Sequence, residues 1–153
     1  MKMTTRRIVA ASGAALLLSA LALPAFAADA TPVGRWQTID DATGKPKSIV
    51  EISDAGGGVL EGKVVELLNP SKPNPTCDNC EGERKGKPIQ GMTILWGVKK
   101  DGDSWDGGKI LDPEKGKVYG AKLTPQADGQ KLQVRGFIGV SMLGRTQEWI
   151  KAP

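Results

Sequence analysis

The chain has 153 residues, with 21 basic and 17 acidic side chains, 20 glycines, 10 prolines and no histidine. This length suits one domain, and the regular apolar segments exclude a disordered protein. The absence of histidine excludes Ser-His-Asp and Cys-His nucleophilic systems and most zinc sites that depend on histidine ligands.

Residues 1–27 have the features of a secretory signal peptide. Three basic side chains near the N-terminus precede an apolar run over residues 8–23, which is rich in Ala and Leu. Residues 25–27, Ala-Phe-Ala, have the small-x-small pattern of a cleavage site, so we expect the cut after Ala27. The apolar run is shorter and richer in small residues than the ~20 strongly apolar residues of a spanning helix. We therefore expect an exported, periplasmic protein that does not span the membrane.

The charge balance changes when residues 1–27 are removed. The remaining residues 28–153 carry 18 basic and 17 acidic side chains, a net charge of +1. Because these charges are interspersed and form no concentrated basic stretch, we expect no nucleic-acid partner. The 126 residues that remain are enough for one domain that buries about two-thirds of its extended-chain surface.

Most of the chain after Pro32 alternates between apolar and polar residues with a period of two, which is typical of half-buried strands. The expected strands cover residues 33–38, 47–53, 59–68, 91–98, 104–111, 117–123, 131–140 and 144–151. Turns rich in Gly and Asp separate them, and no segment has the period of an amphipathic helix. Glycines inside several strands allow sharp bending, which favours a barrel over a flat sandwich. The sequence therefore predicts an all-β fold, a single antiparallel barrel of about eight strands.

Residues 69–90 interrupt this pattern with four prolines and both cysteines. In an oxidising compartment, Cys77 and Cys80 are expected to form a disulfide that stiffens the loop and contributes ~2 kcal/mol. A redox-active pair and half of a metal site are the alternatives. A thioredoxin-type pair normally begins a helix, which residues 81–86 do not resemble. A zinc site would need two further carboxylate ligands, so we expect no metal.

Several short motifs are spread over roughly residues 33–151. They are Gly34-x-Trp36, Asp40-Asp41-x-Thr43-Gly44, Lys47-Ser48, Gly91-Met92, Trp105-x-Gly107-Gly108-x-Ile110-Leu111-Asp112-Pro113, Gly116-Lys117-x-Tyr119, Val134-Arg135-Gly136 and Gly144-Arg145-Thr146-Gln147-x-Trp149. In combination they resemble a bacterial family catalogued as domain of unknown function 2147. This resemblance implies an exported, lipocalin-like β-barrel and no established activity.

A looser resemblance is to the lipocalins, whose first strand carries Gly-x-Trp and whose last strand supplies a basic residue that packs over the Trp. By this resemblance, Gly34 and Trp36 face inward, and Arg145 covers the indole ring of Trp36. Such a cation–π contact is worth ~1–2 kcal/mol when it is desolvated. The resemblance therefore implies a structural role for these three residues.

Several carboxylates are candidates for catalytic groups. Asp40 and Asp41, together with Glu51 or Asp112, could supply the two carboxylates of a glycosidase-like site. However, Asp40 and Asp41 precede Thr-Gly and Asp112 precedes Pro113, and both are natural turn positions. We therefore expect no catalytic residues and a protein that is not an enzyme.

Alternation predicts which side chains line the interior of the barrel. Met92, Ile94 and Trp96 share one face of their strand, and Trp105 and Tyr119 are expected on the same inner face. These residues line a cavity if the barrel is hollow, or belong to a packed core if it is filled.

One basic residue beside this inner face is a candidate for ligand binding. Arg135 is one residue out of phase with the inward Val134, so it is expected at the rim or outside. If its side chain points inward, it is a candidate for binding a carboxylate head group.

Residues 137–143 are apolar where a turn is expected. An exposed apolar loop can serve as a ligand portal, a membrane-touching lip or a partner contact. The alternative is a loop folded over the barrel mouth as a lid.

The leading hypothesis is non-catalytic binding of a small hydrophobic or amphipathic molecule in the cell envelope, without a cofactor. Barrel size, inward aromatic side chains and export support it. The alternatives are an interaction or scaffold protein of the envelope with a filled barrel, and an enzyme of unassigned type.

Overall fold

The computed structural model describes residues 29–140 and 143–153. The predicted signal peptide and the start of the predicted domain at residue 28 lie outside the described residues. The middle of the apolar loop, residues 141–142, lies outside them as well.

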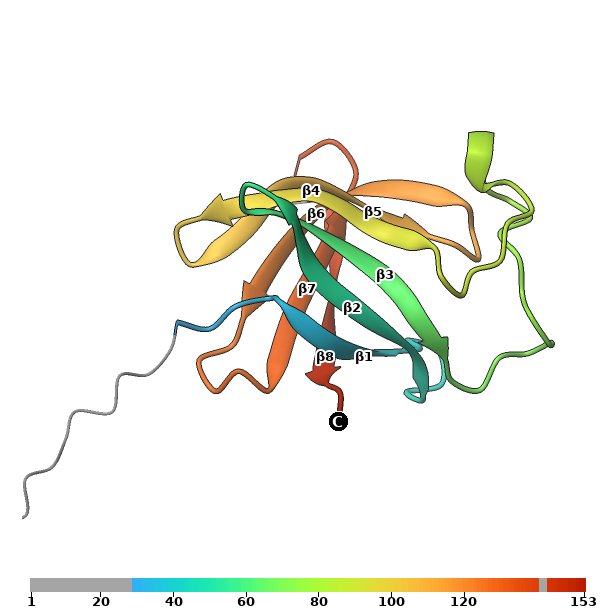
Figure 1. Cartoon of the computed structure of the whole chain (residues 1–153), viewed down its shortest axis with the longest axis horizontal. Helices are drawn as coiled ribbons and strands as arrows, with labels where there is room; N and C mark the ends of the chain where they lie inside the picture. The colour runs from blue at the N-terminus through green and yellow to red at the C-terminus, as the bar shows by residue number, and fades with distance from the viewer. Residues whose placement is uncertain (1–28, 141–142) are drawn as a thin grey trace, which may run out of the picture.

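Eight antiparallel strands form a closed barrel in which each strand pairs with the next and the last pairs with the first (Figure 1). The strands are β1 (Gly34–Ile39), β2 (Pro46–Gly56), β3 (Val59–Leu67), β4 (Thr93–Asp101), β5 (Ser104–Asp112), β6 (Lys117–Pro125), β7 (Lys131–Phe137) and β8 (Gly144–Lys151). The predicted all-β barrel is confirmed. One short 3₁₀ helix, η1 (Gly82–Arg84), lies in the long connection after β3. No helix among the described residues has the length and apolarity needed to cross a membrane.

Aspartates at the strand ends determine where the strands turn. In four turns an Asp carboxylate accepts a hydrogen bond from the backbone N–H two residues later, as is typical of Asx turns. The pairs are Asp40 with Ala42, Asp54 with Gly56, Asp112 with Glu114, and Asp128 with Gln130. Because consecutive strands run in opposite directions, these turns gather at the two ends of the barrel.

One end of the barrel, the closed end, is filled by side chains from the starts of the odd-numbered strands and the ends of the even-numbered strands. Its buried residues are Trp36, Ile52, Leu60, Val98, Trp105, Leu123 and Leu132. The other end, the mouth, is surrounded by the connections over residues 40–45, 68–92 and 113–116, and by residues 138–140 and 143 of the last connection. The closed end is therefore packed with apolar side chains.

A basic side chain does cover Trp36, but it is Lys151. The two residues are partners in the β1–β8 ladder, and the Lys151 Nζ lies 4.6 Å from the centroid of the indole ring. Arg145 lies six residues earlier on β8, about 20 Å away at ~3.3 Å per residue. The expectation that Arg145 covers Trp36 was therefore wrong, because strand register places Arg145 at the mouth. Trp36 Nε1 donates a hydrogen bond to the Pro32 carbonyl at 2.6 Å.

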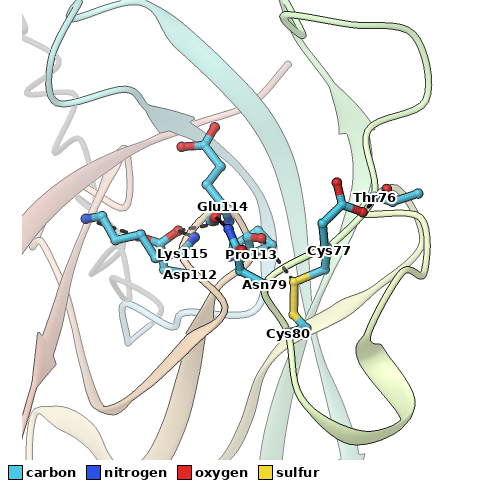
Figure 2. Close-up of a disulfide and its surroundings, with 9 residues drawn as sticks. Thr76, Cys77, Asn79, Cys80, Asp112, Pro113, Glu114 and Lys115 are labelled. Atoms are coloured by element: carbon cyan, nitrogen blue, oxygen red, sulfur yellow. Dashed lines mark hydrogen bonds and ion pairs between the residues drawn. A yellow bond between two sulfur atoms is a disulfide. The ribbon is translucent and has the colours of Figure 1, made fainter.

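The predicted Cys77–Cys80 disulfide is present and holds the long connection against the β5–β6 turn (Figure 2). Cys77 Sγ lies 3.0 Å from the Pro113 carbonyl oxygen, and Asn79 Nδ2 donates to the Glu114 carbonyl at 2.9 Å. Both cysteines are buried in one apolar cluster with Ile89, Met92 and Leu111. The connection is therefore docked on the barrel as an ordered wall beside the mouth.

Candidate ligand cavity

A cavity of about 1390 Å³ opens at the mouth and extends into the barrel. Each strand contributes one or more side chains to its wall, including Thr38, Ser48, Val64, Ile94, Ile110, Tyr119, Val134 and Trp149. Small-molecule sites typically occupy ~300–1,000 Å³. The open half of the barrel is therefore large enough for such a molecule, and its walls are mainly apolar.

The deeper part of the wall has one polar contact between β1 and β2. The hydroxyl groups of Thr38 and Ser48 lie 2.7 Å apart, and both side chains are buried. Within residues 29–140 and 143–153, no buried side-chain nitrogen or oxygen lacks a hydrogen-bond partner. The polar groups of the deeper wall are therefore satisfied by one another.

A second polar group lies at the mouth, and we call it the Asp41 cluster: Asp41, Arg145, Gln147 and Trp149. The Asp41 carboxylate forms an ion pair with Arg145 and accepts a hydrogen bond from Gln147 Nε2 at 2.5 Å. Gln147 Oε1 in turn accepts a hydrogen bond from Trp149 Nε1 at 3.2 Å. Arg145, Gln147 and Trp149 alternate along β8, so they share its inner face.

The Asp41 cluster lies beside β1 and β8, the neighbouring strands that share the shortest ladder of the barrel. The β1–β8 ladder has two residue pairs, Trp36 with Lys151 and Gln37 with Ile150, whereas the β7–β8 ladder has seven. The mouth half of β8 therefore has no ladder partner from β1 among the described residues. The side chain of Asp41 spans this seam between the β1–β2 loop and β8.

The other carboxylates near the mouth are engaged in turns or ion pairs. Asp40 Oδ1 accepts hydrogen bonds from the Thr43 hydroxyl and backbone N–H, each at 2.8 Å. These bonds, led by the hydroxyl, and the nearby Lys47 lower the pKa of Asp40 below its ordinary value of 3.8. Lys47 Nζ also lies 2.9 Å from Glu114 Oε2, which links β2 to the β5–β6 turn.

Of the four carboxylates that could supply a glycosidase-like pair, Asp40, Asp41 and Asp112 line the mouth of the cavity and Glu51 does not. Asp112 accepts hydrogen bonds from the backbone N–H groups of its own turn, and Glu51 is exposed and paired in register with Arg35 and Lys63. In the part of the chain that the structure describes, no three His, Cys, Asp or Glu side chains converge on a point that could hold a metal ion.

Of the residues predicted to line a cavity, Ile94 and Tyr119 do so. Trp105 is buried in the packed closed end, paired with Leu123, and Met92 is buried at the end of the long connection. Arg135 is paired in register with Lys122 and Thr146, and its Nη1 donates to the Thr146 hydroxyl at 3.1 Å. Its side chain is not part of the cavity wall.

The prediction that Trp96 faces inward was wrong because β4 contains a bulge. Thr93 pairs with Lys63 and Leu95 pairs with Gly62, so β4 has one extra residue, Ile94, between positions that are neighbours on β3. Ile94 and Leu95 are therefore both buried, and the alternation shifts by one position before Trp96. Trp96 instead lies opposite exposed Lys109, under the guanidinium of Arg84 at 4.3 Å from the ring centroid.

Sequence reasoning missed Thr38, Ser48 and Gln147 as cavity residues and Asp41 as the partner of Arg145. Thr38 and Ser48 each lie two residues from an inward residue, so alternation could have identified them. No local pattern indicates that a loop residue such as Asp41 contacts β8, more than one hundred positions away.

The described residues of the apolar loop predicted over residues 137–143 lie at one side of the mouth. Ile138 and Leu143 line it, and their side chains are 65% and 71% exposed. Val140 is 61% exposed. The described part of the loop is therefore open to solvent, as expected for a portal or a contact surface.

Comparison with known proteins agrees with this architecture. A solved structure of a protein from the human pathogen Helicobacter pylori, described as belonging to the lipocalin family, superposes with a TM-score of 0.69. The two share 20% sequence identity over 79% of this chain and 82% of the other, so the likeness concerns the fold alone. No curated protein sequence matches the chain. The profile of one family covers residues 34–151, and the chain therefore belongs to the bacterial family DUF2147, described as "Uncharacterized protein conserved in bacteria".

Proposed function

We propose that this protein is a non-catalytic binding protein that holds a small, partly apolar molecule in the open half of its barrel. The observation that supports this most is the cavity of about 1390 Å³ that extends from the loops at the mouth into a lipocalin-like barrel. The closed end is packed, so a ligand would enter through the mouth and rest on the buried layer beneath. Transfer of its apolar part from water would contribute roughly 25 cal/mol per Å² buried.

The absence of a catalytic role is part of the proposal. The chain has no histidine, and the turn carboxylates Asp40 and Asp112 already accept hydrogen bonds from their own turns. We also propose that the protein works in the periplasm, because residues 1–27 have the features of a cleaved export signal.

Native mass spectrometry of the protein purified gently from the periplasm tests this function. We expect an adduct of defined mass that disappears on denaturation. A bare chain that also fails to bind any apolar fluorescent probe would overturn the proposal.

A cavity-filling variant tests where the probe binds. A Cβ added at Gly136 would lie 3.6 Å from Tyr119 Cβ and 3.7 Å from Ile110 Cγ2, which are ordinary contacts. We therefore expect Gly136→Leu to fold and to lose probe binding, because its side chain enters the cavity. Gln133→Leu, on the exposed side of the same strand, is the matched control and should bind normally. Equal binding by both variants would exclude the cavity as the site.

A partner-binding role is the second candidate function, and one observation favours it. Ile138, Val140 and Leu143 are more than half exposed beside the mouth, an unusual concentration of apolar surface in one loop. Covalent cross-linking in intact periplasm should then give a defined complex that the double substitution Ile138→Ser and Leu143→Ser abolishes. An unchanged cross-linking pattern would contradict this role.

A further inference from the structure

The inner face of β8 ends at the mouth in two side chains that both contact Asp41. Arg145 pairs in register with Gly136, and a side chain at Gly136 would contact Tyr119 and Ile110. Since cross-strand partners project to the same face of a sheet, Arg145 projects toward the cavity. Its guanidinium therefore lies at the mouth end of the apolar cavity wall.

Arg145 and Lys47 are the cations that barrel strands bring to this edge, and Lys45, Lys72 and Lys115 line the mouth from its loops. Lys47 forms an ion pair with Glu114 at 2.9 Å, and this pair crosses from β2 to the β5–β6 turn. Arg145 is 62% exposed and its partner Asp41 is 40% exposed. Exposed ion pairs contribute little to stability, so the Asp41 carboxylate can be exchanged for another anion at small cost.

Gln147 is held in the orientation that suits an anion. Its Oε1 accepts a hydrogen bond from Trp149 Nε1, which turns the Nε2 amide group toward the Asp41 carboxylate. An oxyanion in the position of that carboxylate would receive hydrogen bonds from both Gln147 and Arg145. A guanidinium presents two parallel N–H groups that match carboxylate and phosphate oxygens.

We propose that the Asp41 carboxylate occupies the place of a ligand's anionic head group, and that the ligand is an amphiphile with a carboxylate or phosphate head and an apolar tail. This inference rests on the proposed binding function. The head would replace Asp41 on Arg145 and Gln147, at the seam where the β1–β8 ladder has ended. The tail would extend along Tyr119, Ile110 and Val134 toward the packed end.

Binding of four decyl compounds tests the head group. Dissociation constants for decanoate, decyl phosphate, decanol and decylamine are measured by calorimetry and by intrinsic tryptophan fluorescence, to which Trp149 in the cavity wall contributes. We expect one or both anions to bind more tightly than decanol, and decylamine to bind least tightly. The tighter of the two anions identifies the head-group chemistry.

Two substitutions have opposite expected effects on anion binding. Arg145→Gln removes the cation and should weaken binding of the anions by roughly tenfold, with little effect on decanol. Asp41→Asn removes the competing carboxylate and should strengthen anion binding several-fold. In the Arg145→Gln background, Asp41→Asn should give no such gain, because the two effects depend on the same site.

The control is Arg135→Gln, which removes a positive charge from the neighbouring strand outside the cavity wall. It should leave all four dissociation constants unchanged, and thermal melting should show that every variant is folded. Unchanged anion binding in Arg145→Gln, or weaker anion binding in Asp41→Asn, would overturn the head-group assignment. If none of the four compounds binds the natural protein, the binding function itself fails.

Discussion

Lys151 Nζ lies over the indole ring of Trp36, 4.6 Å from its centroid, and the contact joins the last strand of the barrel to the first. Gly34, two residues before Trp36, leaves the space that the ammonium group occupies. An added Cβ at Gly34 would lie 2.5 Å from Lys151 Nζ. The Gly-x-Trp motif and Lys151 are therefore one structural unit at the closed end.

Replacing Lys151 by Met should lower the free energy of unfolding by about 1 kcal/mol, because the cation–π contact is lost while most of the packing is kept. Arg145→Met, a change of the same kind at the exposed mouth, should alter stability by less than ~0.5 kcal/mol. Urea unfolding of both variants measures the difference. Equal losses would show that the Lys151 contact contributes nothing specific.

Gly34→Ala should destabilise the barrel by about 1–3 kcal/mol, since φ at this position is +137° and the new methyl group meets Lys151. Only the steric part depends on the lysine. In a Lys151→Ala background the penalty should therefore shrink, and a double-mutant cycle gives the coupling free energy. A coupling of zero would assign the whole effect to backbone strain.

Gly116→Ala should separate the disulfide loop from the β5–β6 turn. An added Cβ at Gly116 would overlap the backbone of Asn79 and Cys80, which cannot move aside as a side chain can. Gly129 has nearly the same φ, +68° against +67°, and nothing within 4 Å of an added Cβ. Gly129→Ala therefore measures the backbone strain alone, and we expect Gly116→Ala to cost at least ~2 kcal/mol more. Hydrogen exchange at residues 76–80 should accelerate only in the Gly116 variant.

Replacing both cysteines by Ala should lower the free energy of unfolding by ~2 kcal/mol, because the closed loop is short. The bond is buried and docked on Pro113, so it should resist reduction, with a potential below about −300 mV. Redox titration of the folded protein measures this potential. A value near that of thioredoxin, about −270 mV, would favour the redox-active alternative.

The Asp40 carboxylate should stabilise the folded protein near neutral pH and lose this contribution in acid. Hydrogen bonds from Thr43, and then Lys47, lower the pKa of Asp40 in the folded protein. The stabilisation is therefore complete above the unfolded pKa, ~3.9, and is lost as pH falls through the lower folded pKa. Removing the largest cause by Thr43→Val should raise the Asp40 pKa toward 3.8, as measured by NMR titration. A pKa that does not rise would show that the hydroxyl is not the cause.

Only part of the cavity could be predicted from the sequence. Strict alternation placed Ile94 and Tyr119 in the wall, where they are found, but it also placed Met92, Trp96 and Trp105 there, and they are not part of it. The rule failed for Trp96 because Ile94 is an extra residue in β4, between the partners of Lys63 and Gly62. The pairing with the partner strand decides whether such a bulge forms and where the alternation shifts.

The sequence by itself determined the strands, the turns and the disulfide, because these depend on residues that are neighbours in the chain. Period-two alternation, Asp-led turns and a Cys-x-x-Cys pair all act over a few positions. The tertiary structure decided which basic residue covers Trp36 and which carboxylate meets Arg145. Both choices depend on how β1 and its following loop align with β8, and that register results from closing the whole barrel.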